Sequence, residues 1–318
     1  MREATMIANL DQILDAIADY PVKTLAVAAA EQESVVAAVK EARDRNIAGA
    51  ILFGNQAKLE ALAAQVGLSM DGVRIVDCAT PLEAAQKACL AVHNGEAEIL
   101  MKGHLHTDDF LRAVLDKETG LRSGSVMSHV FILETTFRGK LTMVTDGAMN
   151  IAPDLVTKAE IIMNAVYFAR CLGIERPKVG VLAAVELVNP KMPATLDAAA
   201  LNTMQLRGQF PDCIVDGPFA LDNAISKEAA IEKGIGGEVA GDCDIIVTAD
   251  IETGNALAKS FAFLCGGRTA GVLIGAAAPI VLTSRADSAE AKLYSIAASV
   301  LMADMTRDGC LKAGKVHY

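Results

Sequence analysis

The sequence predicts an α/β fold with a mostly parallel sheet, and three observations support this class. Apolar runs of strand length alternate with segments of helical periodicity along most of the 318 residues. Hydrophobic residues make up 52% of the chain and aromatic residues only 4%, so the core is built from Ala, Val, Leu, Ile and Met. Such a composition suits parallel strands covered by Ala-rich helices. Repeated strand–helix–strand units of this length also imply right-handed crossovers.

The first part of the chain keeps this alternation throughout. Each apolar run is followed by an amphipathic segment, and Asn55 is placed to cap one of the helices. The expected elements are strands at 24–30, 48–54, 73–76 and 98–101 and helices over 31–45 and 81–93.

The second part begins with a change of rhythm. Two strand-like runs, at 127–134 and 140–145, are joined by residues 135–139 and predict an antiparallel hairpin. A second alternating series follows, with helices over 153–172, 194–207 and 252–264, two short helices around 219–233, and strands at 179–184, 213–215, 244–247 and 270–273.

The length and the change of rhythm together predict two domains. We expect residues 1–129 and 275–318 to form a first α/β domain, and residues 130–274 to form the second. The hairpin then marks the border, and the last strand and last helix return to the first domain.

Charge and cysteine content narrow the function classes. The formal net charge of −10 argues against nucleic-acid and anionic-membrane partners, since both require basic patches. The seven cysteines form no C-x-x-C pair, and most lie in apolar surroundings, which fits a reducing compartment. Residues 1–7 lack the apolar core of a signal peptide, and the longest apolar run, 271–283, is too short to span a bilayer. We therefore expect a soluble cytoplasmic protein.

The most informative polar group follows the last expected strand. The run Ile280–Thr283 leads into Ser284-Arg285, and a helix starts close behind at Asp287-Ser-Ala-Glu290, which has the spacing of a capping box. A helix N-terminus favours an anion, and the planar guanidinium of Arg285 matches phosphate oxygens. The pair can equally be an exposed Arg beside an N-cap Ser, so this motif alone leaves both interpretations open.

A second polar segment, from Lys102 to Arg112, follows the strand at 98–101. In open α/β sheets, ligands bind outside the carboxyl ends of strands. His104, His106 and Asp108 could be read as metal ligands, but their spacing matches no metal template, so we expect no metal. Lys102 and Arg112 beside a helix start fit an anion better.

Three more segments carry polar groups, and two of them have a plain alternative, a turn for 215–222 and a capped surface helix for 250–259. A Gly-rich stretch at 234–241 does not open a helix after a strand, so it is not a dinucleotide-binding fingerprint. The polar groups are Asp146 and Asn150 in 145–153, Asp216 in 215–222, and Asn255 and Lys259 on one helix face in 250–259.

Together and in this order, the motifs resemble those of the phosphate acetyltransferase/phosphate butyryltransferase family, over roughly residues 20–305. The butyryl branch is the closer one, on the strength of Met101-Lys-Gly-His-Leu-His106, Ser128-His-Val130 and Leu282-Thr-Ser-Arg-Ala-Asp287. The motifs of the whole family are His106-Thr-Asp-Asp-Phe-Leu-Arg112, Asp146-x-x-x-Asn150 with Pro153, Val215-Asp-Gly217 with Asp222, Gly254-Asn255-x-x-x-Lys259 and Ser284-Arg285.

The resemblance implies an activity and a fold. Members of the family move an acyl group between the CoA thiol and inorganic phosphate. The implied fold is that of isocitrate and isopropylmalate dehydrogenases, with two α/β/α domains around a cleft, and the second domain is expected to form a homodimer or higher homo-oligomer. CoA is then a substrate, no cofactor is tightly bound, and the acyl group is butyryl or similarly short.

The resemblance also implies roles for single residues. Ser284 and Arg285 match a catalytic Ser-Arg pair and Arg112 matches a second active-site Arg. Ser284 can then stabilise the oxyanion that forms on the acyl carbonyl, while the arginines hold phosphate. We expect the remaining polar groups to bind substrate: Lys102, His104, His106, Asp146, Asn150, Asp216, Asn255 and Lys259.

One family position departs from the pattern. The Asp that serves acetyltransferases as base for the CoA thiol falls on Ala291 here. Asp287 is the nearest catalytic candidate, but it also has the position of a helix cap, and a carboxylate with a pKa of about 3.9 is a poor base for a thiol near 8.5. A second family Arg lies in an insert that this chain lacks, and Lys102 can replace its charge.

Two other functions stay open. An NAD-dependent dehydrogenase on the same fold would need clustered aspartates and a Lys/Tyr pair, yet none of the four tyrosines lies in a polar segment. A catalytically silent protein that binds CoA or phosphate is compatible with the missing Asp.

Overall fold

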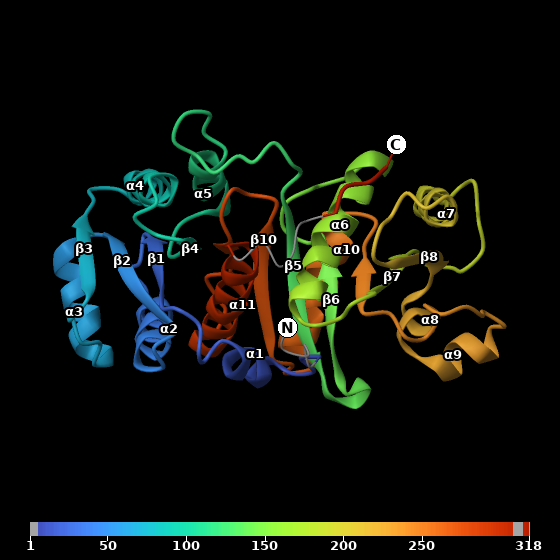
Figure 1. The fold of residues 1–318 in the computed structure, drawn as a ribbon, viewed down its shortest axis with the longest axis horizontal. Helices are drawn as coiled ribbons and strands as arrows, with labels where there is room; N and C mark the ends of the chain where they lie inside the picture. The colour runs from blue at the N-terminus through green and yellow to red at the C-terminus, as the bar shows by residue number, and fades with distance from the viewer. Residues whose placement is uncertain (1–5, 308–313, 318) are drawn as a thin grey trace. The chain divides into compact units, whose positions relative to one another are not determined.

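The computed structural model describes residues 6–307 and 314–317, and it divides into two compact α/β units. The first, which we call the Ser284 unit, consists of residues 10–125 and 270–307. The second, which we call the hairpin unit, contains residues 6–9, 126–269 and 314–317. Both units have a sheet with helices packed on it (Figure 1).

The Ser284 unit is built on a mostly parallel sheet in the order β3-β2-β1-β4-β11-β10. Neighbouring strands pair in parallel from β3 to β11, and β10 pairs with β11 in antiparallel orientation. The strands are β1 (Lys23–Ala28), β2 (Ala48–Gly54), β3 (Val73–Asp77), β4 (Ile99–Lys102), β10 (Thr269–Ile274) and β11 (Ile280–Val281).

Helices cover this sheet in two groups. Helix α2 packs on α3 and α11, whereas α4 packs on α5, and the two groups lie on opposite sides of β1 and β2 (Figure 1). A short helix that the sequence analysis did not predict, α1 (Leu10–Ala16), packs on α11 through Leu10, Ile13 and Leu14. The other helices are α2 (Glu33–Asp44), α3 (Gln56–Val66, capped by Asn55 as predicted), α4 (Pro81–His93), α5 (Thr107–Val114) and α11 (Ala289–Arg307).

The connections of β1 and β4 create a topological switch point. Strand β1 leads into α2 on one face, and its neighbour β4 leads into α5 on the other. Between two such strands the loops diverge, which leaves room for a ligand outside the carboxyl ends.

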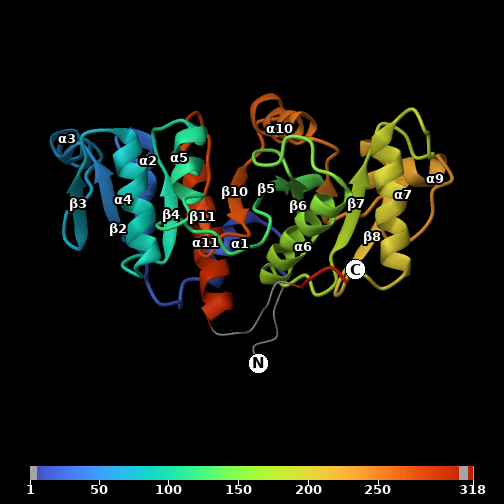
Figure 2. The same cartoon turned by 90° about the horizontal axis from the view of Figure 1, so that it is seen from above.

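The hairpin unit has the strand order β5-β6-β9-β7-β8. The predicted antiparallel hairpin is present, with β5 (Ser128–Thr135) and β6 (Lys140–Thr145) joined by a 3-10 turn at Thr136–Arg138. The remaining pairs are parallel, and the predicted helix over 252–264 divides into α10 and a π-helix. The other elements are β7 (Lys178–Leu182), β8 (Ile214–Phe219), β9 (Ile245–Val247), α6 (Leu155–Cys171), α7 (Pro193–Leu206), α8 (Leu221–Ile225), α9 (Lys227–Glu232), α10 (Ile251–Lys259) and the π-helix Ser260–Leu264 (Figure 2).

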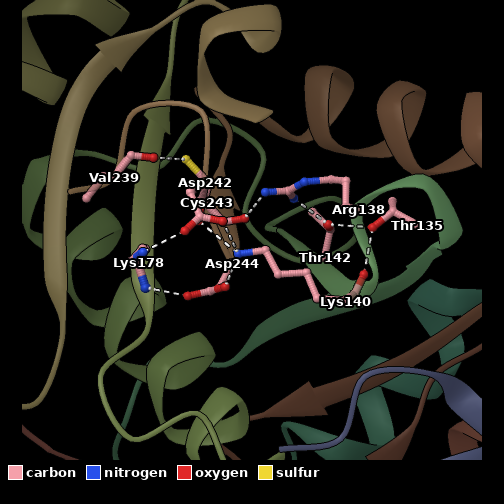
Figure 3. A network of polar contacts seen from close by, with 9 residues as sticks. All are labelled: Thr135, Arg138, Lys140, Thr142, Lys178, Val239, Asp242, Cys243 and Asp244. Atoms are coloured by element: carbon pink, nitrogen blue, oxygen red, sulfur yellow. Dashed lines mark hydrogen bonds and ion pairs between the residues drawn. The ribbon is translucent and has the colours of Figure 1, made fainter. Parts of the chain in front are cut away.

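A network of ion pairs fixes the amino ends of three strands in the hairpin unit (Figure 3). Lys178 pairs with Asp242 at 2.6 Å, and Lys140 pairs with Asp244 at 2.5 Å. Burial by itself raises the pKa of Asp242, but hydrogen bonds from Lys178 and Lys140 outweigh burial and hold this pKa at about 2. Because Lys140 and Lys178 begin β6 and β7, the network lies at the edge opposite the carboxyl ends and is structural.

The cysteines agree with the expectation of buried thiols. Five of the six described cysteines are buried and free, while Cys265 is free and exposed. Cys310 lies outside the described residues. Among residues 6–307 and 314–317, none of the helices combines the length and apolar character that crossing a membrane requires.

Candidate active site

The carboxyl ends of β1, β4 and β11 meet at one edge of the Ser284 unit. Just past β4, the N–H groups of Gly103 and His104 donate to the carbonyls of Ala28 and Ala29, at 2.8 and 2.7 Å. A Cβ on Gly103 would lie 2.2 Å from the Ala29 carbonyl oxygen, so only glycine allows the two loops to come this close. At the switch point, the loops after β1 and β4 are therefore held close together by backbone hydrogen bonds.

The Ser284–Asp287 turn follows β11 at the same edge. Asp287 Oδ2 accepts from the Ser284 N–H at 2.7 Å, and the Ser284 carbonyl accepts from the Asp287 N–H at 3.2 Å. Ser284 Oγ accepts from the Ala286 N–H at 3.3 Å, which leaves the hydroxyl proton available as a donor. Ser284 and Arg285 are both exposed. The turn thus offers a hydroxyl donor and a guanidinium to solvent.

The helix after this turn begins one residue later than the capping-box spacing predicts. Ser288 Oγ accepts from the Ala291 N–H at 3.1 Å, which is the N-cap geometry, and α11 starts at Ala289. The interpretation of Asp287 as the helix cap is therefore wrong. Its carboxylate prefers the Ser284 N–H because the turn brings that donor within reach.

Two buried lysines lie close to the turn. Lys102 is 2% exposed, and its ammonium donates to the Gly103 carbonyl at 3.5 Å. Burial, followed by the positive charges of Arg285 and Lys292, lowers the pKa of Lys102 to about 8, and Asp287 opposes this shift. Lys292 is 1% exposed, and burial lowers its pKa as well. Three cations and one carboxylate leave an excess of positive charge, which suits an anionic ligand.

The other residues selected in this unit lie on its surface. Arg112 is near the end of α5, and its guanidinium pairs with Asp109 at 3.5 Å. His104 and His106 are exposed and flank Leu105 in the loop between β4 and α5. Within the described chain, no three His, Cys, Asp or Glu side chains gather into a set that could hold a metal ion.

In the hairpin unit, Asp146 organises the loop after β6. It is 3% exposed, and its carboxylate accepts from the N–H groups of Ala148, Met149 and Asn150 at 2.9, 3.2 and 3.1 Å. Asn150 Nδ2 also donates to Asp146, at 2.6 Å, and to the Met127 carbonyl, at 2.9 Å. These contacts satisfy the carboxylate within the protein, so Asp146 shapes this loop.

The same loop packs on the start of α10. Asn255 Nδ2 donates to the Gly147 carbonyl at 2.9 Å. A Cβ on Gly254 would lie 2.3 Å from the Asp146 carbonyl oxygen, so glycine is required for this close approach. The structure thus brings Asp146, Asn150 and Asn255 together, while Lys259 is exposed at the last residue of α10.

Asp216 lies apart from this group. It is in β8, which β9 and β7 separate from β6 in the sheet. Its carboxylate accepts from Asn202 Nδ2 at 2.7 Å and from the Gly217 N–H at 2.8 Å. Burial raises the pKa of Asp216, and the Gly217 N–H partly opposes this. Asp216 is therefore a half-buried carboxylate that joins β8 to α7 through its hydrogen bond with Asn202.

Sequence reasoning missed two residues that hold the Ser284–Asp287 turn. Lys292 donates to the carbonyls of Ser284 and Asp287, at 3.3 and 2.5 Å. Gln32 Nε2, at the start of α2, donates to the Arg285 carbonyl at 2.7 Å. The only sequence signal for Lys292 was a charge beside the apolar stripe of the last helix, and Gln32 had none.

Comparison with known proteins places the chain in a family. Residues 80–300 match the family described as phosphate acetyl/butaryl transferase. The chain is 45% identical over 298 residues to the phosphate butyryltransferase of Clostridium acetobutylicum, covering 94% of this chain and 99% of the relative. It is 51% identical over 280 residues to the probable phosphate butyryltransferase of Bacillus subtilis, covering 87% and 92%.

A solved structure agrees with these sequence relatives. The branched-chain phosphotransacylase of Enterococcus faecalis V583 aligns with a TM-score of 0.77 and 32% identity, covering 89% of this chain and 99% of that one. The chain therefore belongs to the phosphate acetyl/butaryl transferase family, which confirms the resemblance seen in its motifs.

Proposed function

We propose that this protein is a phosphate acyltransferase that moves a short acyl group between CoA and inorganic phosphate. The observation that carries the proposal is the exposed Ser284-Arg285 turn at a sheet edge where two buried lysines add positive charge. Its membership of the family and the names of its relatives support the same activity.

In the proposed mechanism, the cations hold the phosphate for attack on the thioester. Arg285 offers a planar fork for two phosphate oxygens, and the buried Lys102 adds a point charge. Attack of a phosphate oxygen on the acyl carbonyl places negative charge on the carbonyl oxygen. The free O–H of Ser284 donates to this oxyanion, and the C–S bond then breaks to give acyl phosphate and the CoA thiolate.

Asp287 is poorly suited to remove the proton of the CoA thiol, because its carboxylate already accepts a hydrogen bond from the Ser284 N–H. A carboxylate that receives this bond is stabilised in its charged form and is a weak base. We propose that Asp287 shapes the turn, and that the reaction uses thiolate that forms without it. Arg112, His104 and His106 remain candidates for binding substrate from the surface of the same unit.

The acyl group is proposed to be butyryl or another short chain, in line with the relatives. CoA enters as a substrate, and we propose no tightly bound cofactor. The residues of the hairpin unit, Asp146, Asn150, Asp216, Asn255 and Lys259, are proposed to bind substrate or to support residues that do. Of these, Lys259 is the exposed cation and Asp146 acts through its loop.

The wider assignments are proposals of the same kind. We propose a fold of the isocitrate and isopropylmalate dehydrogenase type, with the predicted domains 1–129 plus 275–318 and 130–274, and a homodimer formed through the second domain. The division into two α/β units supports the two-domain part. A cytoplasmic location follows from the substrates, since acyl-CoA is an intracellular metabolite.

The decisive experiment is a panel of acetyl-, propionyl-, butyryl- and isobutyryl-CoA with phosphate, monitored by thiol release. Phosphate-dependent release, fastest with one short chain, is expected. No release with any of the four, together with binding of CoA, would favour the silent binding protein. Absorbance at 340 nm with NAD and a hydroxy acid tests the dehydrogenase alternative, for which no change is expected.

A further inference from the structure

Lys292 contacts the Ser284–Asp287 turn from beneath. Its ammonium donates to the Ser284 carbonyl at 3.3 Å and to the Asp287 carbonyl at 2.5 Å, from the first turn of α11. The residue is 1% exposed, and among the described residues no carboxylate forms an ion pair with it. The hydrogen bonds of its ammonium therefore go to the two ends of the turn that carries Ser284 and Arg285.

A buried lysine without an ion pair is costly for the fold, although the carboxylate of Asp287 lies near enough to oppose the lowering of the Lys292 pKa. Burying an ammonium group is unfavourable unless hydrogen bonds compensate, and an apolar side chain of similar shape would avoid this cost. The ammonium of Lys292 donates to carbonyls of one short turn. Lys292 therefore fixes the shape of that turn more than it adds to the overall stability of the protein.

A second side chain holds the same turn from another helix. Gln32 Nε2 donates to the Arg285 carbonyl at 2.7 Å. Three of the four carbonyls in the turn, those of Ser284, Arg285 and Asp287, thus accept from side chains at the N-cap of α2 or in α11. Reacting groups must be held within a fraction of an ångström of their productive geometry. A turn fixed in this way meets that requirement before substrate arrives.

We propose that Lys292 is a positioning residue, which keeps the Ser284 hydroxyl and the Arg285 guanidinium in one geometry by closing the turn beneath them. The proposal rests on the acyl-transfer function proposed above. It assigns Lys292 no contact with substrate, because the side chain is covered by the turn.

Lys23 provides a matched control. It is another buried lysine of the same unit, 2% exposed, and it pairs at 2.9 Å with Asp304, which belongs to α11 as Lys292 does. Lys23 begins β1, at the amino end of the sheet, and does not touch the Ser284–Asp287 turn. The Lys23→Met substitution therefore removes a buried lysine that contacts α11 through Asp304, without releasing the turn.

The test compares Lys292→Met, Lys292→Arg and Lys23→Met with wild type. It measures kcat and KM for butyryl-CoA and phosphate, thermal unfolding, and hydrogen exchange of the backbone amides at 284–287. In Lys292→Met we expect kcat to fall on the order of 10²-fold, since a misplacement of about 1 Å can cost this much, with faster exchange confined to the turn. Lys292→Arg restores donors and charge and should recover most of the rate.

Lys23→Met should lower the unfolding temperature while leaving kcat and exchange in the turn unchanged. The proposal is overturned if Lys292→Met keeps wild-type kcat and turn protection, or if both Met variants lose rate in proportion to stability. If Lys292→Met does not fold, Lys292→Gln replaces it. The amide keeps a donor in the buried site, so we expect a smaller fall in kcat with faster exchange at 284–287, and wild-type values of both would overturn the proposal. Wild-type protein without turnover would refute the acyltransferase function, whereas exchange in the turn would still report on Lys292.

Discussion

Asp287 closes the turn that carries the candidate catalytic pair, because its carboxylate accepts a 2.7 Å hydrogen bond from the backbone N–H of Ser284. The next residue, Ser288, caps the helix instead. Asp287 thus sets the geometry of the turn and Ser288 sets the start of α11, so that each contact can be tested alone.

Asp287→Asn should leave acyl transfer active with its pH dependence intact. The amide oxygen can still accept from the Ser284 N–H, and the substitution removes only the charge. Initial rates over a range of pH check this in both reaction directions. Abolished activity together with a flat pH–rate profile would instead identify Asp287 as the base for the thiol.

Arg285→Ala should lower the rate by orders of magnitude and leave folding intact, because Arg285 is exposed and supplies charge to the site. Thiol release and thermal unfolding measure the two effects. Arg45→Ala is a suitable control, since Arg45 is an exposed arginine of the same unit that pairs with Glu41 at 2.8 Å. Near-wild-type turnover of Arg285→Ala would rule out the Ser-Arg assignment.

Ser284→Ala should cost roughly 2–4 kcal/mol of transition-state stabilisation, because the variant loses the donor to the oxyanion. Ser288→Ala provides the contrast: it should lower stability by about 1 kcal/mol, through loss of the helix cap, and keep the rate. The ratio of kcat/KM values and denaturant unfolding measure the two quantities. If Ser288→Ala lowered kcat/KM and Ser284→Ala did not, Ser288 would be the donor to the oxyanion instead of Ser284.

The KM for phosphate should rise as pH increases through about 8, the lowered pKa of Lys102, because the ammonium loses its charge above that pH. In the unfolded chain the pKa of Lys102 is 10.5, so between about pH 8 and 10.5 the unfolded state binds this proton and the folded state does not. The contribution of Lys102 to the free energy of unfolding therefore increases with pH over this range. Lys102→Met should have a higher KM at neutral pH without the further rise. Since the ionisation of phosphate itself is common to both proteins, equal pH profiles would exclude Lys102 from phosphate binding.

Gly254→Ala should destabilise the hairpin unit by roughly 1–3 kcal/mol, the usual cost of overpacking, because the new Cβ would meet the Asp146 carbonyl oxygen at 2.3 Å. It should also raise the KM for acyl-CoA, because the Asp146 loop is proposed to support substrate binding. Gly236→Ala, in the same unit, has nothing within 4 Å of its Cβ and should change stability by less than about 0.5 kcal/mol. Thermal unfolding and the KM for acyl-CoA distinguish the two variants.

Much of the architecture could be predicted from local pattern. The alternation of apolar runs and amphipathic segments predicted the α/β class, the hairpin at β5–β6 and the helix that Asn55 caps. Helix α1 was missed because it is only seven residues long and its apolar pattern is limited to Leu10, Ile13 and Leu14. The end of α10 was misjudged because the chain stays helical past Lys259, as the π-helix Ser260–Leu264, and the sequence pattern does not distinguish the two helix types.

The sequence by itself determined which chemical groups follow which strands: Lys102 after β4, Ser284 and Arg285 after β11, and Asp146 after β6. The order of those groups was also enough to recognise the family. Only the tertiary structure decided what each group contacts. Gln32 and Arg285 are 253 positions apart, yet they share a 2.7 Å hydrogen bond, and Lys292 reaches back under the turn that precedes its own helix. Such contacts depend on the pairing of β1, β4 and β11, and strand order is set by long-range packing that no local pattern encodes.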